Sequence, residues 1–201
     1  MNRGVLAIMR GLMPNRPLSQ LEAMRIAELQ AMRLLEISGC DHAPVPDRVV
    51  TKVPKILVKR LTPWPVSGAT DWAKGTWVIA LNGNESRRRQ RFTLAHEFKH
   101  ILDYRYIDIA YPATSSMSHH ERAEAVCDYF AGCLLVPRRW LKAAWGNGVQ
   151  QPRALADTFD VSSAAIQTRL LQTGLTFQTE RCLDSAQFRF HRRSELLIAT
   201  T

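Results

Sequence analysis

The chain has 201 residues, of which 46% are hydrophobic and 22% charged, a composition that predicts one well-buried globular domain. No run of 18 apolar residues occurs, and the apolar stretch 5–9 is stopped by Arg10, which excludes a transmembrane helix and a convincing signal peptide. We therefore expect a cytoplasmic protein with no membrane partner. The net charge of +9 is concentrated in residues 51–110, with eleven basic and five acidic groups, and favours acidic protein or nucleic acid partners.

The first part of the chain predicts one long helix followed by short strands. Apolar residues recur at three- and four-residue spacing over residues 19–37, and Gly39 can end this helix. The proline-containing stretch 41–54 predicts an extended connector. Residues 55–61 and 76–81 are rich in β-branched side chains, and turn residues lie between them, so we expect a small antiparallel meander.

The turn after the second predicted strand leads into a helix over residues 86–103, which Asn84 or Ser86 can cap. The strand directly before this helix could lie at a sheet edge, where an extended peptide can add as a further strand. The alternative is that residues 77–81 form an ordinary buried strand, and the sequence leaves both open. Four arginines fall in the first turns of the helix: Arg87, Arg88, Arg89 and Arg91. We interpret them as a solvated face, with contacts to nucleic acid or to an acidic substrate as alternatives.

Residues 96–100 of this helix read His-Glu-Phe-Lys-His, an HExxH sequence. Positions i and i+4 lie on one helix face about 5–6 Å apart, so the imidazoles of His96 and His100 can bind one metal ion. Glu97 projects about 100° away, near the open side of that metal. With a third protein ligand, zinc keeps one position for a water whose pKa falls towards about 7, and Glu97 can deprotonate it. The motif predicts a hydrolytic centre with one Zn²⁺ per chain.

The two histidines need a third protein ligand. The HExxHxxGxxH class of zinc proteases is excluded, because Asp103 and Tyr106 stand where that class has glycine and histidine. A later amphipathic helix offers Glu121 and Glu124. We favour Glu124 because Asp128 shares its helix face and can accept the spare N–H of a ligating histidine, which an alanine at the same offset from Glu121 cannot do.

This second helix is predicted over residues 119–135 and is stopped by Pro137. His120 lies on the face of the favoured glutamate, and it is a candidate alternative ligand or hydrogen-bond donor to the oxyanion. An exposed and inert histidine is the other interpretation of this position. Tyr104, Tyr106 and Tyr111 are further candidates for the oxyanion donor, and the residues alone leave the choice open.

Short helices are predicted in the last third of the chain, over residues 137–145, 153–159 and 162–171. The stretch 154–170 is typical of a helix-turn-helix, with a small alanine, a tight turn and a serine cap. This suggests a second class of function, a DNA-binding regulator. Residues 148–201 carry only six basic and five acidic groups, so we expect weak DNA affinity and favour a structural or docking role. A further strand is predicted at 187–190.

Two separated motifs resemble those of the ImmA/IrrE family of zinc metallo-endopeptidases. Residues 91–100 read RFTLAHEFKH and residues 124–137 read EAVCDYFAGCLLVP, similar to the family's RFTLAHELGH and ExxANxFAxxLLMP. The resemblance covers roughly residues 48–140. The chain departs from the family pattern with Phe98 and Lys99 for Leu-Gly, Cys127 and Asp128 for Ala-Asn, and Val136 for Met.

The resemblance implies that His96, His100 and Glu124 bind zinc and that Glu97 is the general base. For the whole chain we expect an α+β fold: a zincin-like core over residues 1–147 that includes the N-terminal helix, with a small antiparallel or mixed sheet packed on the HExxH helix and the glutamate helix. A small helical, helix-turn-helix-like segment would follow over 148–201. The implied substrate is a helix-turn-helix repressor, cut at a specific site. The alternative is a non-proteolytic regulator that binds DNA or a repressor and uses the zincin fold as a scaffold.

Overall fold

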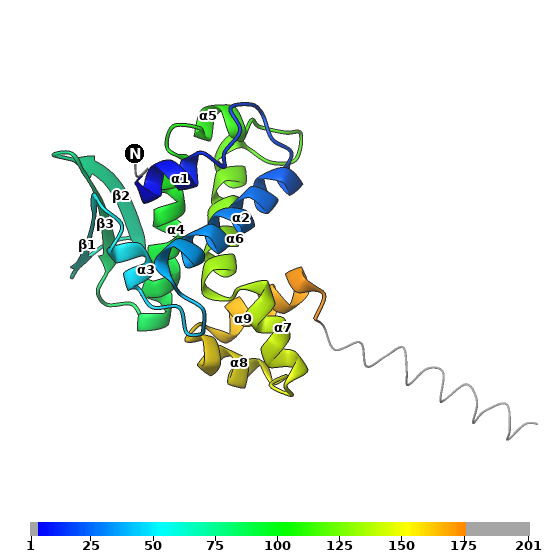
Figure 1. Cartoon of the computed structure of the whole chain (residues 1–201). Helices are drawn as coiled ribbons and strands as arrows, with labels where there is room; N and C mark the ends of the chain where they lie inside the picture. The colour runs from blue at the N-terminus through cyan, green and yellow to red at the C-terminus, as the bar shows by residue number, and fades with distance from the viewer. Residues whose placement is uncertain (1–3, 176–201) are drawn as a thin grey trace, which may run out of the picture. The chain divides into compact units, whose positions relative to one another are not determined.

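The computed structural model of the protein describes residues 4–175, and the strand predicted at 187–190 lies outside them (Figure 1). The elements in chain order are α1 Val5–Arg10, α2 Gln20–Ser38, α3 Arg48–Thr51, β1 Ile56–Leu61, β2 Gly68–Ala73, β3 Thr76–Asn82, α4 Arg87–Asp103, α5 Ile107–Ala110, α6 His119–Leu135, α7 Arg138–Gly146, α8 Pro152–Phe159 and α9 Ser163–Thr173. The fold is therefore mixed α+β, and no described helix is long and apolar enough to cross a membrane.

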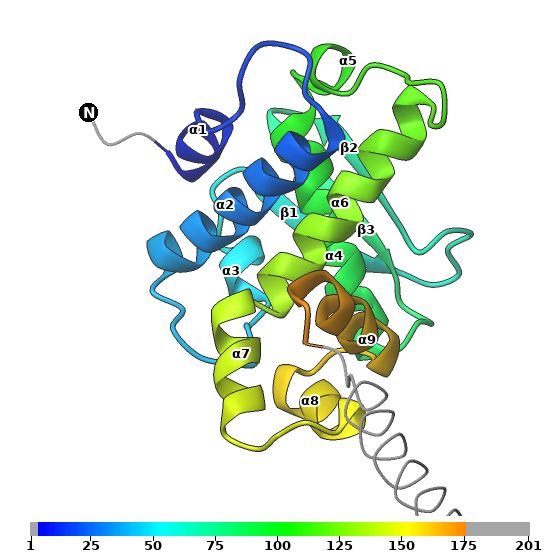
Figure 2. The same ribbon diagram turned by 90° about the vertical axis from the view of Figure 1, so that its right-hand side faces the viewer.

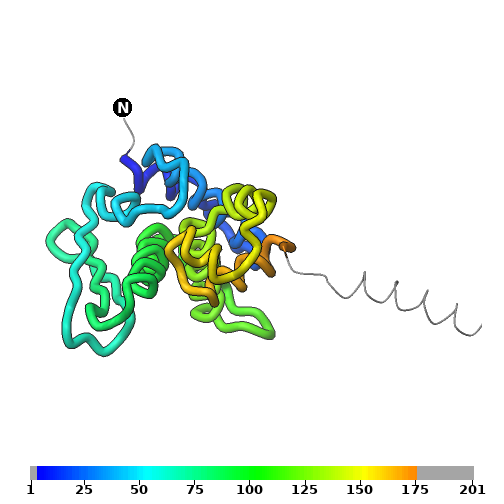
Figure 3. The backbone as a smooth tube through the Cα atoms, turned by 90° about the horizontal axis from the view of Figure 1, so that it is seen from below, coloured from blue at the N-terminus to red at the C-terminus, as the bar shows by residue number. Residues whose placement is uncertain are grey.

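The chain forms two compact units, Met1–Arg169 and Leu170–Thr201. In the first unit, α6 packs against both α2 and α4, and α4 in turn packs against β2 and β3 (Figures 1 and 2). Seen from below, the strands lie on one side of α4 and the later helices of this unit on the other (Figure 3). The described part of the second unit is residues 170–175, which contain the end of α9, and Thr173 Oγ1 donates a hydrogen bond to Leu170 O there.

The sheet has three strands in the order β1-β3-β2, with β1 parallel and β2 antiparallel to β3. Lys74 and Gly75 join β2 to β3 with φ angles of 51° and 79°, the left-handed pair that a two-residue hairpin turn needs. The predicted antiparallel meander is thus wrong for β1, which pairs with the other side of β3. The edge position suggested for the strand before α4 is also wrong: β3 is central, and β2 is the edge strand beside α4.

Local capping sets the ends of the three long helices. Ser86 accepts a hydrogen bond from Arg89 N and caps α4, as predicted. At the start of α6, Ser118 and Glu121 form a reciprocal capping box. Gly39 ends α2 in the left-handed conformation, which confirms its predicted role. The connector before β1 differs from the prediction, because it contains the short helix α3, which buries Val49 and Val50.

A buried ion pair lies inside α4. Lys99 Nζ is 2.6 Å from Asp103 Oδ1 and donates a 2.8 Å hydrogen bond to Gln30 Oε1 on α2. The hydroxyl of Tyr111 donates to the second Asp103 oxygen at 2.5 Å. Lys99 stands where the family pattern has glycine, and its charge is tolerated in the core because both ions are paired and hydrogen-bonded.

The arginines at the start of α4 bind the helix-turn-helix-like segment. Arg88 lies 2.8 Å from Asp157 and 3.3 Å from Asp160, which follows α8. Arg91 is 3% exposed and its Nε lies 3.4 Å from Asp160 Oδ2. The interpretation of this cluster as a solvated face is therefore wrong for Arg91, whereas the side chain of Arg88 is 37% exposed and makes its ion pairs at the surface. The acidic partners Asp157 and Asp160 lie some 70 residues away in the sequence, so the local sequence does not indicate these ion pairs.

The first half of α9 is poorly suited to DNA. Arg169 is the only cation within residues 163–169, and it is 1% exposed. Its Nε donates a hydrogen bond to Val136 O, and its guanidinium lies over the ring of Tyr129. A recognition helix needs exposed cations for phosphate contacts, so the observed burial favours the structural role predicted for this segment.

Candidate metal centre

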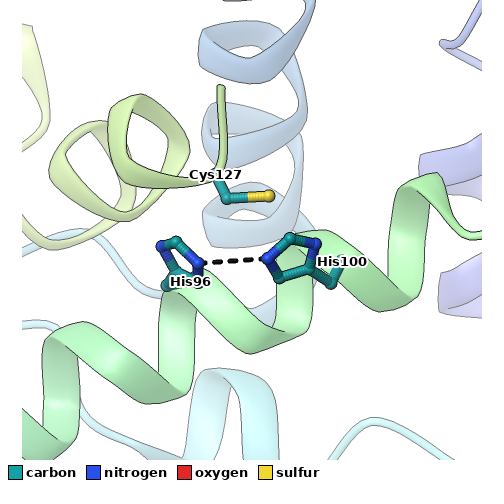
Figure 4. Close-up of side chains that lie close together, drawn as sticks. All are labelled: His96, His100 and Cys127. Atoms are coloured by element: carbon teal, nitrogen blue, oxygen red, sulfur yellow. Dashed lines mark hydrogen bonds between the residues drawn. The ribbon is translucent and has the colours of Figure 1, made fainter. Parts of the chain in front are cut away.

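Helices α4 and α6 bring three predicted ligands into one cluster. His96 Nε2 and His100 Nε2 lie 3.1 Å apart, because i and i+4 side chains share one face of α4 (Figure 4). Glu124 Oε2 lies 3.3 Å from His96 Nε2, and Glu124 Oε1 lies 3.2 Å from His100 Nε2. Ligands bonded to a tetrahedral zinc at about 2.0–2.1 Å are about 3.3 Å from one another. The three residues therefore fit a zinc ion in donor type, and each of the measured pair distances is near that spacing.

Asp128 orients the first histidine. Its Oδ1 lies 2.8 Å from His96 Nδ1, so an ionised Asp128 selects the tautomer with the proton on Nδ1 and leaves Nε2 free for a metal. Burial lowers the pKa of His96, but the hydrogen bond and charge of Asp128, with Glu124 and Glu97, raise it above its usual value. Burial and the neighbouring His96 lower the pKa of His100.

The edge strand β2 contacts the carboxylate of Glu97, which is only 9% exposed. Thr70 Oγ1 donates a 2.7 Å hydrogen bond to Glu97 Oε2. One pleat away, a Cβ on Gly68 would lie 2.4 Å from Thr93 Cγ2 and 3.0 Å from Glu97 Cγ. Strand and helix approach so closely at this point that only glycine fits. Neither Thr70 nor Gly68 was predicted from the sequence, because their partners lie more than twenty residues away.

The profile of the IrrE N-terminal-like domain, peptidase family M78, matches residues 53–171. The chain belongs to this family. The matched region includes β1 to β3, both helices of the candidate metal centre and nearly all of α9. Family membership supports a metallopeptidase, and it agrees with the resemblance that the two sequence motifs carry.

Comparison with solved structures gives a second likeness for this IrrE-like chain. A Mycobacterium tuberculosis transcriptional regulator matches with a TM-score of 0.59 and 19% sequence identity. The match covers 77% of this chain and 48% of that chain, so the IrrE-like chain spans about half the length of that regulator. At this identity the likeness shows the fold alone. Comparison with curated proteins finds no match.

Two further candidates of the IrrE-like domain, Glu121 and His120, lie near the start of α6 but differ from Glu124 in their contacts. Glu121 is held by Ser118 in the capping box, whereas Glu124 faces the histidines. The spacing Ser-x-x-Glu at a helix start is typical of a capping box, and this sequence signal argues against Glu121 as the third metal ligand. The side chain of His120 is 81% exposed, and its Nδ1 lies 3.8 Å from Glu124 Oε1.

The tyrosine candidates for the oxyanion donor lie beyond the end of α4. Tyr104 is 61% exposed, and its ring packs edge-on against Trp77 with 4.9 Å between centroids. Tyr106 precedes α5, and its backbone N–H donates to Asp103 O. The identity of the oxyanion donor, among these tyrosines and His120, stays a prediction.

Cys127 is a feature of the centre that the sequence interpretation missed. Its thiol sulfur and the ligand nitrogens of His96 and His100 all lie within 4.8 Å of one another (Figure 4). The residue is 1% exposed, and burial raises the pKa of its thiol well above the usual value. Its position three residues after Glu124 on one helix face was a sequence signal for this placement. Cys40 and Cys133 are also buried free cysteines.

Proposed function

We propose that this protein is a zinc-dependent endopeptidase that makes limited cuts in a protein substrate. The observation that carries this proposal is the cluster of His96, His100 and Glu124. The two histidine Nε2 atoms lie 3.1 Å apart, and each lies 3.2–3.3 Å from one Glu124 carboxylate oxygen. These three residues would hold the metal. When bound, zinc supplies a water acidified to a pKa of about 7 and polarises the scissile carbonyl.

The proton transfers fall to Glu97. Its carboxylate accepts a proton from the attacking water and later delivers it to the leaving amine, the usual two roles of one general base and acid. Thr70 holds one carboxylate oxygen, Oε2, and thereby fixes the direction from which the other can accept the proton. Asp128 keeps His96 in the tautomer that leaves Nε2 available.

Strand β2 is well placed to hold an extended peptide. Asn82 N donates to Ser67 O, so this antiparallel pair is a hydrogen-bonded one. Hydrogen-bonded and non-hydrogen-bonded pairs alternate, which directs the backbone groups of Gly68, Thr70 and Trp72 away from β3 and towards the open edge. A peptide that pairs with this edge would lie beside Thr70, which contacts Glu97.

We propose a helix-turn-helix transcription repressor as the substrate. The motif resemblance to the ImmA/IrrE family supports this class, and the similarity to a transcriptional regulator fits a regulatory setting. The burial of Arg169 speaks against direct DNA binding by α9 as the alternative function.

The test is incubation of the purified protein with the repressor encoded beside its gene. We expect two discrete fragments, their loss after treatment with a chelator, and their return when zinc is added. Mass spectrometry of the fragments identifies the cut. An intact repressor in the presence of zinc would contradict the proposed substrate, and cleavage that ignores the chelator would contradict the metal dependence.

A further inference from the structure

The face of α6 that meets the histidines carries two donors, not one. Glu124 and Cys127 are three residues apart, so they lie on the same face of the helix one turn from each other. Figure 4 shows the Cys127 side chain of α6 lying alongside the two imidazoles of α4. Its sulfur lies within 4.8 Å of the ligand nitrogens of His96 and His100.

We propose that Cys127 is a fourth metal ligand, so that zinc is held by His96, His100, Glu124 and Cys127 in the resting protein. The inference rests on the proposed metal centre and extends it. Zinc is borderline soft and binds thiolate sulfur at about 2.3 Å, close to its bonds to imidazole nitrogen. Sulfur and nitrogen ligands of one tetrahedral zinc are about 3.6 Å apart, so the thiol needs to move by about 1 Å at most.

Burial by itself does not explain where this thiol points. Cys133 lies on the same helix and is also buried, at 3% exposed. The group of mutually close metal-ligand atoms among the described residues consists of His96, His100 and Cys127, and it includes neither Cys133 nor Glu124. Glu124 approaches the two histidines through a different carboxylate oxygen for each. Ordinary buried cysteines behave as small hydrophobic groups. Cys127 instead faces two imidazoles and is followed by Asp128, which binds one of them. The two cysteines therefore form a matched pair for experiment.

Coordination by Cys127 has a consequence for the resting state. Four protein ligands are the arrangement of closed zinc sites, whereas hydrolytic sites keep a position for water. The thiolate would have to leave, or the coordination number rise to five, before a peptide bond is cut. The family pattern has alanine at this position, so the closed arrangement would belong to this chain.

The experiment is the absorption spectrum of the full-length protein loaded with Co²⁺. Visible d–d bands report cobalt in a tetrahedral protein site, and an intense near-ultraviolet charge-transfer band reports a thiolate ligand. We expect both in the wild type and in Cys133→Ala. Cys127→Ala should keep the d–d bands and lose the charge-transfer band. Its zinc affinity, measured by competition with a chelator, should fall at least about tenfold. Loss of a residue that only hydrogen-bonds to a ligand already lowers metal affinity by this factor, and loss of a direct ligand should cost no less.

The outcomes separate this proposal from the proposed function. Wild-type d–d bands without the charge-transfer band would overturn the cysteine ligand and leave the three-ligand centre intact. Failure of the wild type to bind cobalt or zinc would overturn both proposals. If Cys127→Ala does not fold, the spectra of the wild type and of Cys127→Ser still test the cysteine ligand. The serine variant should lack the charge-transfer band, because a hydroxyl group has no sulfur to give one.

Discussion

The hydroxyl of Thr70 donates a 2.7 Å hydrogen bond to Glu97 Oε2, and it also lies 3.5 Å from the backbone oxygen of Glu97. This contact joins the edge strand β2 to the residue that follows the first histidine of the HExxH helix. A strand suited to bind substrate and a carboxylate suited to move protons are therefore coupled by one side chain.

Replacing Thr70 by valine keeps the shape of the side chain and removes this hydrogen bond. Glu97 then loses its fixed orientation, and we expect kcat for peptide cleavage to fall roughly ten- to a hundredfold, with zinc affinity unchanged. Thr70→Ser, which keeps the hydroxyl, should recover most of the rate. Steady-state kinetics with zinc-loaded enzyme check this, and a valine variant with wild-type kcat would refute the positioning role.

Gly68→Ala should force β2 away from α4. The new Cβ would lie 2.4 Å from Thr93 Cγ2, and we expect the free energy of unfolding to fall by about 1–3 kcal/mol. Thr93→Ser removes the opposing methyl group, so the double variant should be more stable than the sum of the single changes predicts. Denaturant unfolding of the four proteins measures the coupling. Strictly additive changes in the free energy of unfolding would show that a Cβ at position 68 does not clash with the methyl group of Thr93.

Asp128→Ala should weaken zinc binding about 10–100-fold, because His96 loses the acceptor at Nδ1. Asp108→Ala is the matched control, since this carboxylate lies 3.7 Å from His119 Nε2 and is almost fully exposed. Competition with a chelator measures both affinities. Equal zinc affinities for the two alanine variants would exclude a supporting role for Asp128.

The same substitution changes the titration of the metal-free protein. Burial lowers the pKa of His96, and the hydrogen bond and charge of Asp128 raise it above 6.5 on balance. A raised folded-state pKa stabilises the fold below the unfolded value, and this contribution is lost as pH rises through the folded value. Asp128→Ala should therefore lower the pKa of His96, as NMR titration can follow, and reduce stability most on the acidic side. A His96 pKa that does not move would contradict this coupling.

The arginines that bind the helix-turn-helix-like segment should differ sharply in their effect on stability. The side chain of Arg91 is 2% exposed, lies 3.3 Å from Asp47 and donates to Val45 O, so Arg91→Ala should cost about 3–5 kcal/mol. Arg87 also contacts Asp160, but its side chain is 77% exposed, and Arg87→Ala should cost less than about 1 kcal/mol. Urea unfolding compares them. Similar losses for both variants would contradict the buried role of Arg91.

Features with a local cause could be predicted from the sequence. The HExxH spacing fixes the approach of His96 and His100, and helical phase selects Glu124 because Asp128 follows it by four residues. The ends of α4 and α6 follow from serine caps and a proline stop. These signals all lie within a few residues of the feature that they determine.

Features that depend on tertiary partners could not be predicted. The position of β2 at the edge depends on which side of β3 accepts β1, and no local pattern encodes that choice. In the sequence, Lys99 is a substitution for the glycine of the family motif, with no evident partner for its charge. In the structure its ammonium group donates hydrogen bonds to Asp103 and to Gln30, which lies sixty-nine positions away. The arginine cluster likewise acquires its role from Asp157 and Asp160.

The most direct measurement compares the zinc-loaded wild type with Glu97→Gln on one repressor substrate. Glutamine keeps the size of the side chain but cannot accept the proton of the attacking water. Glu97→Gln should bind one zinc per chain with wild-type affinity and release no new amino termini, while the wild type produces a single cut. A variant that cleaves at the wild-type rate would contradict the assignment of Glu97 as the base of a zinc endopeptidase.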